Sequence, residues 1–372
     1  MTTNSHPPAD PVESPAAKMR TIAERLNLSV ATVSRALRRV PGINPGTRAR
    51  VIQAAAQMGY HLPKNYRSEP LDNGQLQHIG ALVEMPANSM PPDSYIVGMS
   101  DAATTLNASL IVHYVKPENC EQILKPQYQP RAMSSGLLSG LILVFRWPTH
   151  IVQKLSKLKP IVSIAHQYPG VETDVLGIDN LGGVELLMRH LHGLGHRQIG
   201  FFGRCPGLHW SSVRFGGYVA ALTNLHLDYR PEWVVDVDSE HLISRESDWD
   251  ACCSQVERLT RSGVTAWVCA SEPAGWELTN CLRARGFRVP EDVSITGFHS
   301  PDRPESGKPD LTSVRASYEA IGAAAMKRIL YRIQNPAEST RAILFPCELQ
   351  NGLTTAPPPG VPAGANLSTL PA

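Results

Sequence analysis

The sequence predicts an all-α helix-turn-helix head joined to a two-lobed α/β body, and three observations support this fold class. Apolar residues between positions 19 and 60 recur at the three- and four-residue spacing of helices. From His78 onward, strands alternate with helices, as in parallel sheets covered on both faces. This alternating region spans about 280 residues, more than one compact sheet usually holds, and therefore favours two lobes.

Charge is divided unevenly along the 372 residues, whose formal net charge is +2. Segment 18–68 holds ten lysines and arginines and one acidic residue, Glu24, for a net charge of +9. The remainder of the chain therefore carries −7. A short basic head on an acidic body indicates a polyanionic partner for the head, and a solvated helical surface is the alternative interpretation.

The sequence has neither a membrane-span pattern nor a secretory leader. No run of 18 apolar residues occurs, and the first 18 residues, MTTNSHPPADPVESPAAK, lack an apolar core. We therefore expect a cytoplasmic protein. The cysteines form no CxxC pair, which predicts buried thiols, no metal site and no cofactor. There are seven of them: Cys120, Cys205, Cys252, Cys253, Cys269, Cys281 and Cys347.

Composition and breaker residues set the expected domain boundaries. Residues 1–18 are rich in Pro, Ser and Thr and are predicted to be a disordered tail. Residues 19–62 form the head, and the polar, proline-containing residues 63–77 form a hinge or linker. The α/β body then runs over 78–356, and a second disordered tail follows over 357–372.

The head is predicted to contain three short helices. MRTIAERLN forms the first, LS breaks it, and Ser29 caps the second, in which Val30, Val33 and Leu37 share a side. After the loop RRVPGIN, Asn44 and the proline behind it mark the start of the third helix. In TRARVIQAAAQMGY the inward residues are Val51, Ile52, Ala55 and Met58. A tight turn between the first two helices is typical of a helix-turn-helix unit.

The body is predicted to alternate strands and helices in chain order. Ligands of such folds bind at the carboxyl ends of strands, so two lobes would offer the cleft between them. Strands are expected at 78–85, 109–115, 139–145, 159–166, 197–203, 264–271, 293–299 and 342–352, with helices near 101–107, 182–196, 216–225, 275–287 and 319–335.

Several stretches together resemble the LacI/GalR family of bacterial transcription regulators. They are TIAERLNLSVATVSRAL, TRARVIQAAAQMGYHLP, VLGIDNLGGVELLMRHLHGLGHRQIGFFG, RFGGYVAAL, GFRVPEDVSITGF and LTSVRASYEAIGAAA. The resemblance covers roughly residues 19–356. It implies a body like the periplasmic binding proteins, with lobe crossings near 165–170, 297–300 and 318–323. It also implies a homodimer, a small effector that is often a sugar or nucleobase, and no catalysis.

The resemblance also places DNA-contacting positions in the head. Val30, Ala31 and Arg35 fall where the family faces base edges, and an arginine can bond guanine O6 and N7. Small hydroxyl and amide side chains are expected on phosphates, and they are Ser29, Thr32, Ser34, Asn44 and Thr47. A symmetric dimer is then expected to read a near-palindromic operator of double-stranded DNA.

The hinge departs from the family pattern. The family commonly has a short helix here that enters the minor groove, but Pro70 breaks a helix and Glu69 and Asp72 bring acid near phosphates. We therefore expect Lys64 and Arg67 to contact the DNA backbone instead.

The effector candidates include a matching arginine and three departures from the family. Arg214 matches the arginine that typically bonds the effector. Ser271 and Glu272 replace the usual ND pair, and His299 replaces the aspartate of the usual GFD. One acceptor carboxylate is thereby lost and an imidazole gained. Further candidates are His166, beside a predicted crossing, and Trp147, Trp210 and Trp276, which either stack on a ligand or belong to the core.

These features favour a repressor whose operator affinity is controlled by a sugar-like or other polar effector. The changed cleft motifs also allow a constitutive DNA binder with a vestigial cleft. An enzyme is disfavoured because the sequence contains no Walker loop, no G-x-S-x-G and no GxGxxG after a strand.

Overall fold

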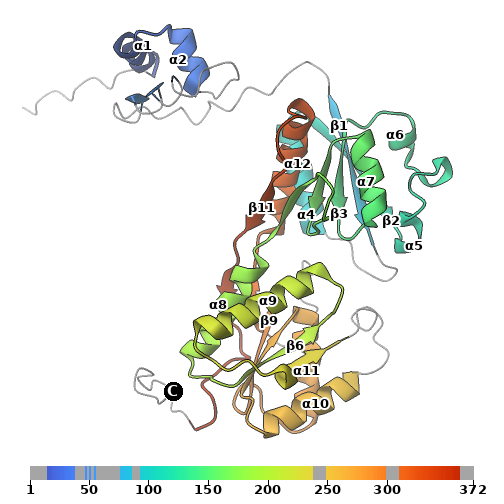
Figure 1. Cartoon of the computed structure of the whole chain (residues 1–372), viewed down its shortest axis with the longest axis vertical. Coiled ribbons are helices and arrows are strands. Elements are labelled where there is room, and N and C mark those ends of the chain that lie inside the picture. Colours follow the sequence, from blue (N-terminus) through green and yellow to red (C-terminus); the bar gives the residue numbers. More distant parts are fainter. Residues whose placement is uncertain are drawn as a thin grey trace, which may run out of the picture. The chain divides into compact units, whose positions relative to one another are not determined.

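The computed structural model describes residues 15–37, 47, 50–51, 54–55, 76–85, 93–237, 249–298 and 310–360. The chain divides into two compact units, residues 1–75 and residues 76–372, which we call the head and the body (Figure 1). No helix in the described ranges combines the length and the apolar character that crossing a membrane requires.

The head contains helices α1 (Pro15–Leu26) and α2 (Val30–Leu37), with further helical residues at 47, 50, 51, 54 and 55. These five positions repeat at the spacing of one helix face, as expected for the predicted third helix. Helix α1 begins at Pro15, so the last four residues of the predicted tail 1–18 are helical. The reason is local: proline suits a first helical turn, and Ala16 and Ala17 are strong helix formers.

The first lobe is built on a six-stranded sheet in the order β11-β5-β4-β3-β1-β2. Every neighbouring pair is parallel, as the alternating pattern predicts. The strands are β1 (Gln77–Glu84), β2 (Ala108–Val115), β3 (Gly140–Val144), β4 (Ile161–Ile164), β5 (Asp174–Ile178) and β11 (Ala342–Phe345).

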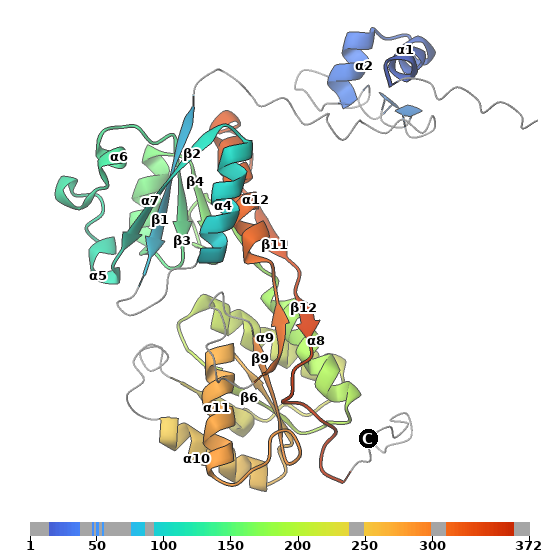
Figure 2. The ribbon, with the colours of Figure 1, turned by 180° about the vertical axis from the view of Figure 1, so that it is seen from behind.

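Alternate residues of β1 point to opposite faces of this sheet, and each face is covered by helices. Ile79 and Val83 pack with α4 (Asp93–Thr105) and α12 (Tyr318–Gln334), which lie side by side in Figure 2. Leu82 faces the other way, into a cluster with residues of α7 (Thr149–Leu158). Short turns α5 (Pro117–Cys120), η1 (Pro126–Tyr128) and α6 (Arg131–Ser134) complete this lobe.

The second lobe has a sheet in the order β12-β10-β9-β8-β6-β7, with β12 antiparallel to β10 and the remaining pairs parallel. Two cores lie on its opposite faces, one with helices α8 (Asn180–Gly193) and α9 (His209–Asn224), the other with α10 (Trp249–Arg261) and α11 (Glu272–Ala284). The strands are β6 (Ile199–Arg204), β7 (Val234–Asp236) behind η2 (Pro231–Trp233), β8 (Ala266–Cys269), β9 (Ser294–Phe298), β10 (Thr312–Arg315) and β12 (Glu348–Gln350).

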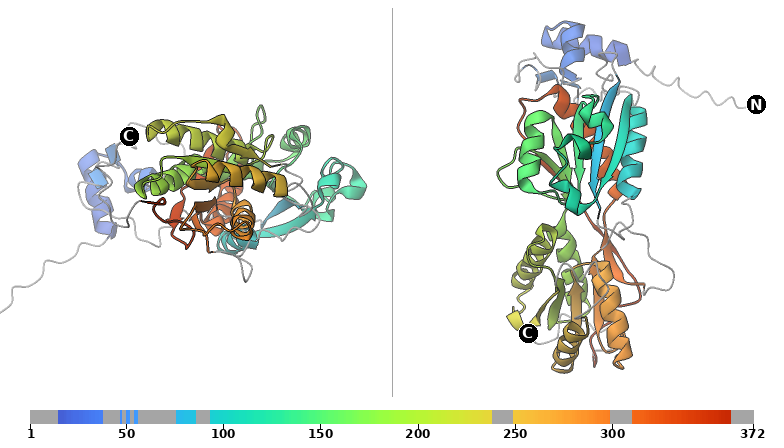
Figure 3. Two further views of the ribbon diagram at one scale, coloured as in Figure 1. Left: turned by 90° about the horizontal axis from the view of Figure 1, so that it is seen from below. Right: turned by 90° about the vertical axis from the view of Figure 1, so that its right-hand side faces the viewer.

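The chain passes between the lobes at three places, and they differ from the predicted ones. The crossings lie between β5 and α8 at residue 179, between β10 and α12 at 316–317, and between β11 and β12 at 346–347. The right-hand view of Figure 3 shows green and orange-red segments that connect the lobes. The predicted crossings at 165–170 and 297–300 are wrong, and the one at 318–323 is a few residues late. Strand periodicity does not reveal which sheet a strand joins, and β5 belongs to the first lobe.

The C-terminal segment is bound to the second lobe up to the predicted boundary at 356, and burial continues just past it. The hydroxyl of Thr354 donates to the carbonyl of Ile295 at 2.7 Å, and the carbonyl of Ala356 lies 2.8 Å from His196 Nε2. Pro358 is buried as well. The predicted tail 357–372 therefore begins slightly too early, because a proline-rich composition does not exclude burial. Burial, outweighing the Ala356 contact, lowers the pKa of His196 to about 4.

Two of the cysteines predicted to be free thiols are joined in a disulfide. Cys253 on α10 and Cys281 on α11 have Cα atoms 6.4 Å apart, within the range that a disulfide spans. Their separation of 28 residues gives no motif, so the pairing depends on the packing of two helices that only the fold brings together.

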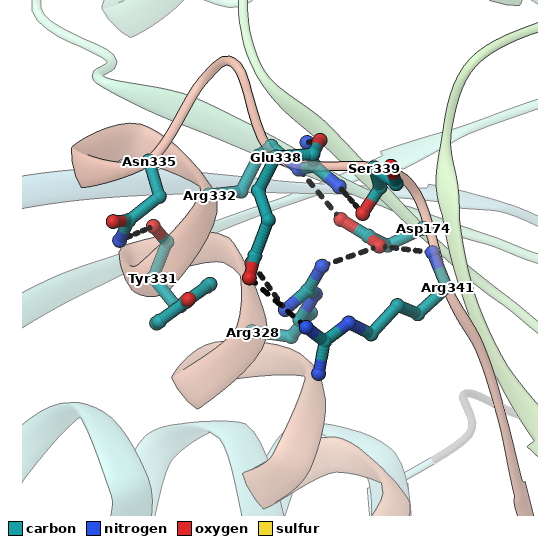
Figure 4. A network of polar contacts seen from close by, with 8 residues as sticks. All are labelled: Asp174, Arg328, Tyr331, Arg332, Asn335, Glu338, Ser339 and Arg341. Atoms are coloured by element: carbon teal, nitrogen blue, oxygen red, sulfur yellow. Dashed lines mark hydrogen bonds and ion pairs between the residues drawn. The ribbon is translucent and has the colours of Figure 1, made fainter. Parts of the chain in front are cut away.

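A buried ionic network joins the end of α12 to the start of β5 (Figure 4). Asp174 accepts hydrogen bonds from Arg328 Nη2 at 2.9 Å, from Arg332 Nε at 2.7 Å and from the backbone nitrogen of Arg341 at 2.7 Å. Arg332 also donates to the carbonyls of Glu338 and Ser339. The network therefore fixes the last turn of α12 against the sheet.

Candidate functional site

The turn between α1 and α2 has the geometry that the sequence predicts for a helix-turn-helix unit. Asn27 adopts a left-handed backbone conformation with φ of 52°, and Ser29 directly precedes α2. Ser29 Oγ accepts a hydrogen bond from the backbone nitrogen of Thr32 at 3.0 Å, which is the expected N-cap. Ile22 and Val33 pack between the helices with no exposed surface. The relative direction of α1 and α2 is thus fixed by a capped turn and a small core.

The predicted DNA-contacting residues of α2 divide between its exposed and buried faces. Val30 is 41% exposed, so it does not belong to the core stripe with Val33 that the sequence suggested. Ala31 is exposed and Thr32 half-buried. Ser34 is buried at 9% exposure, and this burial argues against the predicted phosphate contact. The sequence periodicity alone did not resolve which side of α2 packs inward.

The remaining head candidates are only partly within the described chain. Position 35 lies in α2 one turn after Ala31, and the side chain of Arg35 lies outside the described residues. Thr47 is helical and half-buried. Asn44, Lys64 and Arg67 lie outside the described residues.

A cavity of about 240 Å³ lies between the two lobes of the body. It is formed at the carboxyl ends of strands, where the fold predicts a ligand site. The first lobe contributes Tyr95, Phe145, Ala165, Gln167, Val175, Gly177, Ile178, Tyr318 and Leu344, and the second contributes Asn180, His209, Trp210, Arg214 and Ser271. A ligand here would touch both lobes.

Arg214, predicted as the effector-binding arginine, lines this cavity from α9. Its Nε donates to Asn180 Oδ1 at 2.8 Å and its Nη1 donates to the carbonyl of Ala270 at 2.6 Å. The guanidinium lies 3.6 Å from the ring centroid of Phe298 and 4.8 Å from that of Trp210. Burial lowers the pKa of Arg214 to about 10, so the group stays charged at neutral pH. These contacts orient a cationic fork at the cavity.

The first-lobe wall of the cavity is aromatic. The ring of Tyr95 meets that of Tyr318 at 5.1 Å and that of Phe145 at 6.3 Å, both edge to face. Phe145 and Ala165 each have φ of 67°, a conformation that non-glycine residues rarely adopt. Both follow the carboxyl end of a strand, and such strained positions cluster at binding sites.

Of two further predicted effector residues, Ser271 lines the cavity and His166 lies beside it. His166 sits between two lining residues, and its ring centroid lies 5.9 Å from that of His209. Burial, His209 and Arg146 lower the pKa of His166 to about 4. Ser271 lines the cavity and caps α11 by accepting from the backbone nitrogen of Ala274 at 3.4 Å.

Glu272 is only 5% exposed at the start of α11 and does not line the cavity. His299 lies outside the described residues.

Of the three candidate tryptophans, two belong to the core. Trp147 is 1% exposed and Trp276 is 6% exposed, and each packs in an apolar cluster of its own lobe. Of the two interpretations that the sequence left open for them, burial favours the core over stacking on an effector, because nearness to a strand end does not determine which way a side chain points. Trp210 does line the cavity, against Arg214.

Sequence reasoning missed several lining residues, notably Asn180, Phe145, His209 and Tyr318. Asn180 closely follows β5, so a search for polar residues behind strands would have found it. Tyr318 is the first residue of α12 and directly follows its N-cap, Ser317, so the serine that marks a helix start also marks this position. In the described ranges no group of three or more His, Cys, Asp or Glu side chains is placed to hold a metal ion.

Two family models match the chain. Residues 18–62 match bacterial regulatory proteins of the lacI family, and residues 188–355 match a periplasmic binding protein-like domain. The chain is similar to the transcriptional repressor CytR of Escherichia coli K12, with 26% identity over 90% of this chain and 95% of CytR. It is 25% identical to the repressor PurR of Haemophilus influenzae over 87% and 94% of the two chains.

Solved structures agree on the fold. The regulator CelR in complex with cellobiose matches with a TM-score of 0.60 and 20% identity, over 90% of this chain and 99% of that one. The lac repressor dimer bound to operator and an anti-inducer matches with a TM-score of 0.58 and 22% identity, over 90% and 98%. The named relatives are transcriptional regulators rather than enzymes. The protein therefore combines, in one chain, a DNA-binding domain of the lacI family of bacterial regulatory proteins and a periplasmic-binding-protein-like domain.

Proposed function

We propose that this chain is a cytoplasmic, homodimeric repressor that binds a near-palindromic DNA operator, with an affinity set by a small effector in the interlobe cavity. The observation that carries this proposal is the presence, in one chain, of a capped helix-turn-helix unit and a cavity lined from both lobes. The proposal assigns the body to binding rather than catalysis.

The exposed start of α2 supports the DNA-reading part of the proposal. Val30 and Ala31 offer apolar surface that fits a thymine methyl group, and Arg35 follows one turn later on the same side. A bidentate arginine–guanine contact discriminates between bases by about 1–3 kcal/mol. Ser29 and Thr32 hold their hydroxyls 2.8 Å apart at the helix N-terminus, where phosphate binding is favoured.

The test compares two arginine variants in the full chain. Arg35→Ala is expected to weaken operator binding about 5- to 100-fold and to relax preference at one base pair. Arg25→Ala is the matched control, because it removes the same charge from the exposed side of α1. It should weaken binding slightly and equally for all sequences. Fluorescence anisotropy on a panel of operator variants measures both, and an unchanged base preference for Arg35→Ala contradicts the assignment.

The cavity supports the regulatory part because its walls come from different lobes. Tyr95 and Tyr318 stand on the first lobe, and Trp210 and Arg214 stand on the second. A ligand that contacts both has different affinities for different lobe arrangements, and only such a difference shifts a conformational equilibrium. If no metabolite in a broad library changes thermal stability or operator affinity, the chain is instead a constitutive DNA binder with a vestigial cleft.

A further inference from the structure

Arg214 brings a positive charge to the cavity that its described surroundings do not neutralise. The residue is 7% exposed, and its two hydrogen-bond acceptors, on Asn180 and Ala270, are neutral. No aspartate or glutamate is among the described residues that line the cavity. The groups that act electrostatically on Arg214 are the uncharged Tyr318, Cys347 and Tyr95. Because burying a cation without a counter-ion is costly, an anion bound at this point would be strongly favoured.

The unused donors of Arg214 have the geometry of a carboxylate site. A guanidinium has five N–H groups, and here one is used by Asn180 and one by Ala270. One N–H on Nη1 and two on Nη2 remain without a partner among the described residues. Nη1 and Nη2 together form the end-on fork that matches the two oxygens of a carboxylate. The stack on Phe298 and Trp210 keeps the plane of this fork fixed.

The other cavity walls favour a flat ring over a hydroxyl-rich sugar. Five of the fourteen lining residues carry rings, and the edge-to-face set of Tyr95, Phe145 and Tyr318 forms a largely apolar wall. Sugar hydroxyls need acceptors, yet the described lining contains no carboxylate. Of its two side-chain amides, Asn180 already accepts from Arg214, which leaves the amide oxygen of Gln167. Compared with a sugar, a planar apolar ligand with one acidic group is better matched to the aromatic wall and to the Arg214 guanidinium.

We propose that the effector is a small aromatic carboxylate, held end-on by Arg214 with its ring between the aromatic first-lobe wall and Trp210. This inference rests on the proposed effector-controlled function and narrows its ligand class. The anion pairs with the second lobe while the ring packs on the first, so the ligand joins the two lobes through different chemistry.

The test measures calorimetric affinities of the full chain for matched probes. Benzoate, 4-hydroxybenzoate, cinnamate and indole-3-carboxylate are compared with benzamide, which has the ring without the charge, and with ribose and cytidine. Benzoate is expected to bind at least about 10-fold more tightly than benzamide, because the amide lacks the charge-assisted pair with Arg214. Arg214→Gln should weaken the carboxylate about 10- to 100-fold and leave the amide nearly unchanged.

Two further variants separate the charge of Arg214 from its fork geometry and control for the loss of a surface arginine. Arg214→Lys retains the charge without the fork, so it should keep a preference for acid over amide at reduced affinity. Arg230→Gln is the matched control, since Arg230 also lies over a tryptophan, Trp233, at 4.9 Å, but is exposed on the surface. It should bind every probe as the parent chain does.

The outcomes separate this inference from the proposed function. Equal affinity for acids and amides, or binding of ribose or cytidine while all four acids fail, overturns the aromatic carboxylate and leaves an effector-controlled regulator. Failure of every compound in a broad metabolite library to alter stability or operator affinity overturns both.

Discussion

Replacing Asp174 with asparagine should destabilise the body more than any single surface change. The substitution keeps the shape of the side chain and removes its charge. Asp174 is fully buried, and Arg328 and Arg332 have side chains 8% and 9% exposed. In the variant two guanidinium groups would face a neutral amide, one end of which donates rather than accepts.

The magnitude follows from the two buried guanidinium groups that lose their shared carboxylate in the variant. Glu338 approaches only one of them, at 3.8 Å from Arg328 Nη1, and leaves Arg332 without a carboxylate partner among the described residues. Asp174 accepts from both of them and from the backbone nitrogen of Arg341, all at 2.7–2.9 Å. Removing one partner of a buried pair typically costs about 3–5 kcal/mol, because the remaining charge stays buried. We expect a decrease of the free energy of unfolding in this range, with the parent chain taken as reference.

Urea unfolding of the full chain, followed by circular dichroism, measures this decrease. Glu185→Gln is the control, because Glu185 pairs with Arg189 at 2.7 Å on an exposed helix surface. That change should cost less than about 1 kcal/mol. A cost for Asp174→Asn equal to that of the control would show that burial does not give the network its strength.

The same network predicts an acid dependence. Burial alone raises the pKa of Asp174, but hydrogen bonds from Arg332, Arg328 and Arg341 outweigh it and hold the pKa below its usual value. A carboxylate with a lowered pKa contributes stability above its unfolded-state pKa of about 3.9, and this stability is lost as pH falls through the folded-state pKa. Asp174→Asn should therefore lose less stability than the parent chain below about pH 4.

Three further predictions concern other parts of the chain. Ser29→Ala should destabilise α2 by about 1 kcal/mol, seen as faster amide exchange in the head, whereas unchanged exchange would mean that the cap does not stabilise the helix. His196, with its pKa lowered to about 4 by burial, should contribute stability that is full above about pH 6.5 and lost toward pH 4, about 3 kcal/mol in all. A flatter pH profile for His196→Gln in urea unfolding would verify this. Trp276→Ala should cost about 3–5 kcal/mol of stability, whereas Trp210→Ala should mainly weaken ligand binding, and equal effects on stability would contradict their separate placement.

Local pattern was sufficient to predict most elements and the N-cap at Ser29. Periodicity identifies an element from its own residues, and α8, β6 and α12 therefore lie close to their predicted ranges. The lobe crossings were not predictable in this way, because sheet membership depends on pairings between distant strands. The disulfide between α10 and α11 was not predictable for the same reason, because it depends on how distant helices pack.

The candidate site was predicted well only where a residue type favours one role. A large aromatic residue fits both a core and a ligand site. Arg214 lines the cavity, as its match to the family's effector arginine implies, although the helix predicted from the local pattern began only at residue 216 and α9 begins at His209. Trp147 and Trp276 were not separable from Trp210, because a large aromatic side chain serves a core and a ligand equally well. Its direction depends on the packing of neighbouring helices. The buried face of Ser34 was ambiguous for the same reason.

Ligand occupancy of the interlobe cavity is proposed to change operator binding, and one titration tests this directly. DNA anisotropy of the full chain is measured with and without a saturating ligand found by thermal shift, and repeated with Arg214→Gln. We predict that the ligand changes operator affinity of the parent chain about 5- to 150-fold, the usual range of allosteric coupling, and that Arg214→Gln binds the operator normally but no longer responds. The same operator affinity with and without bound ligand would contradict effector control.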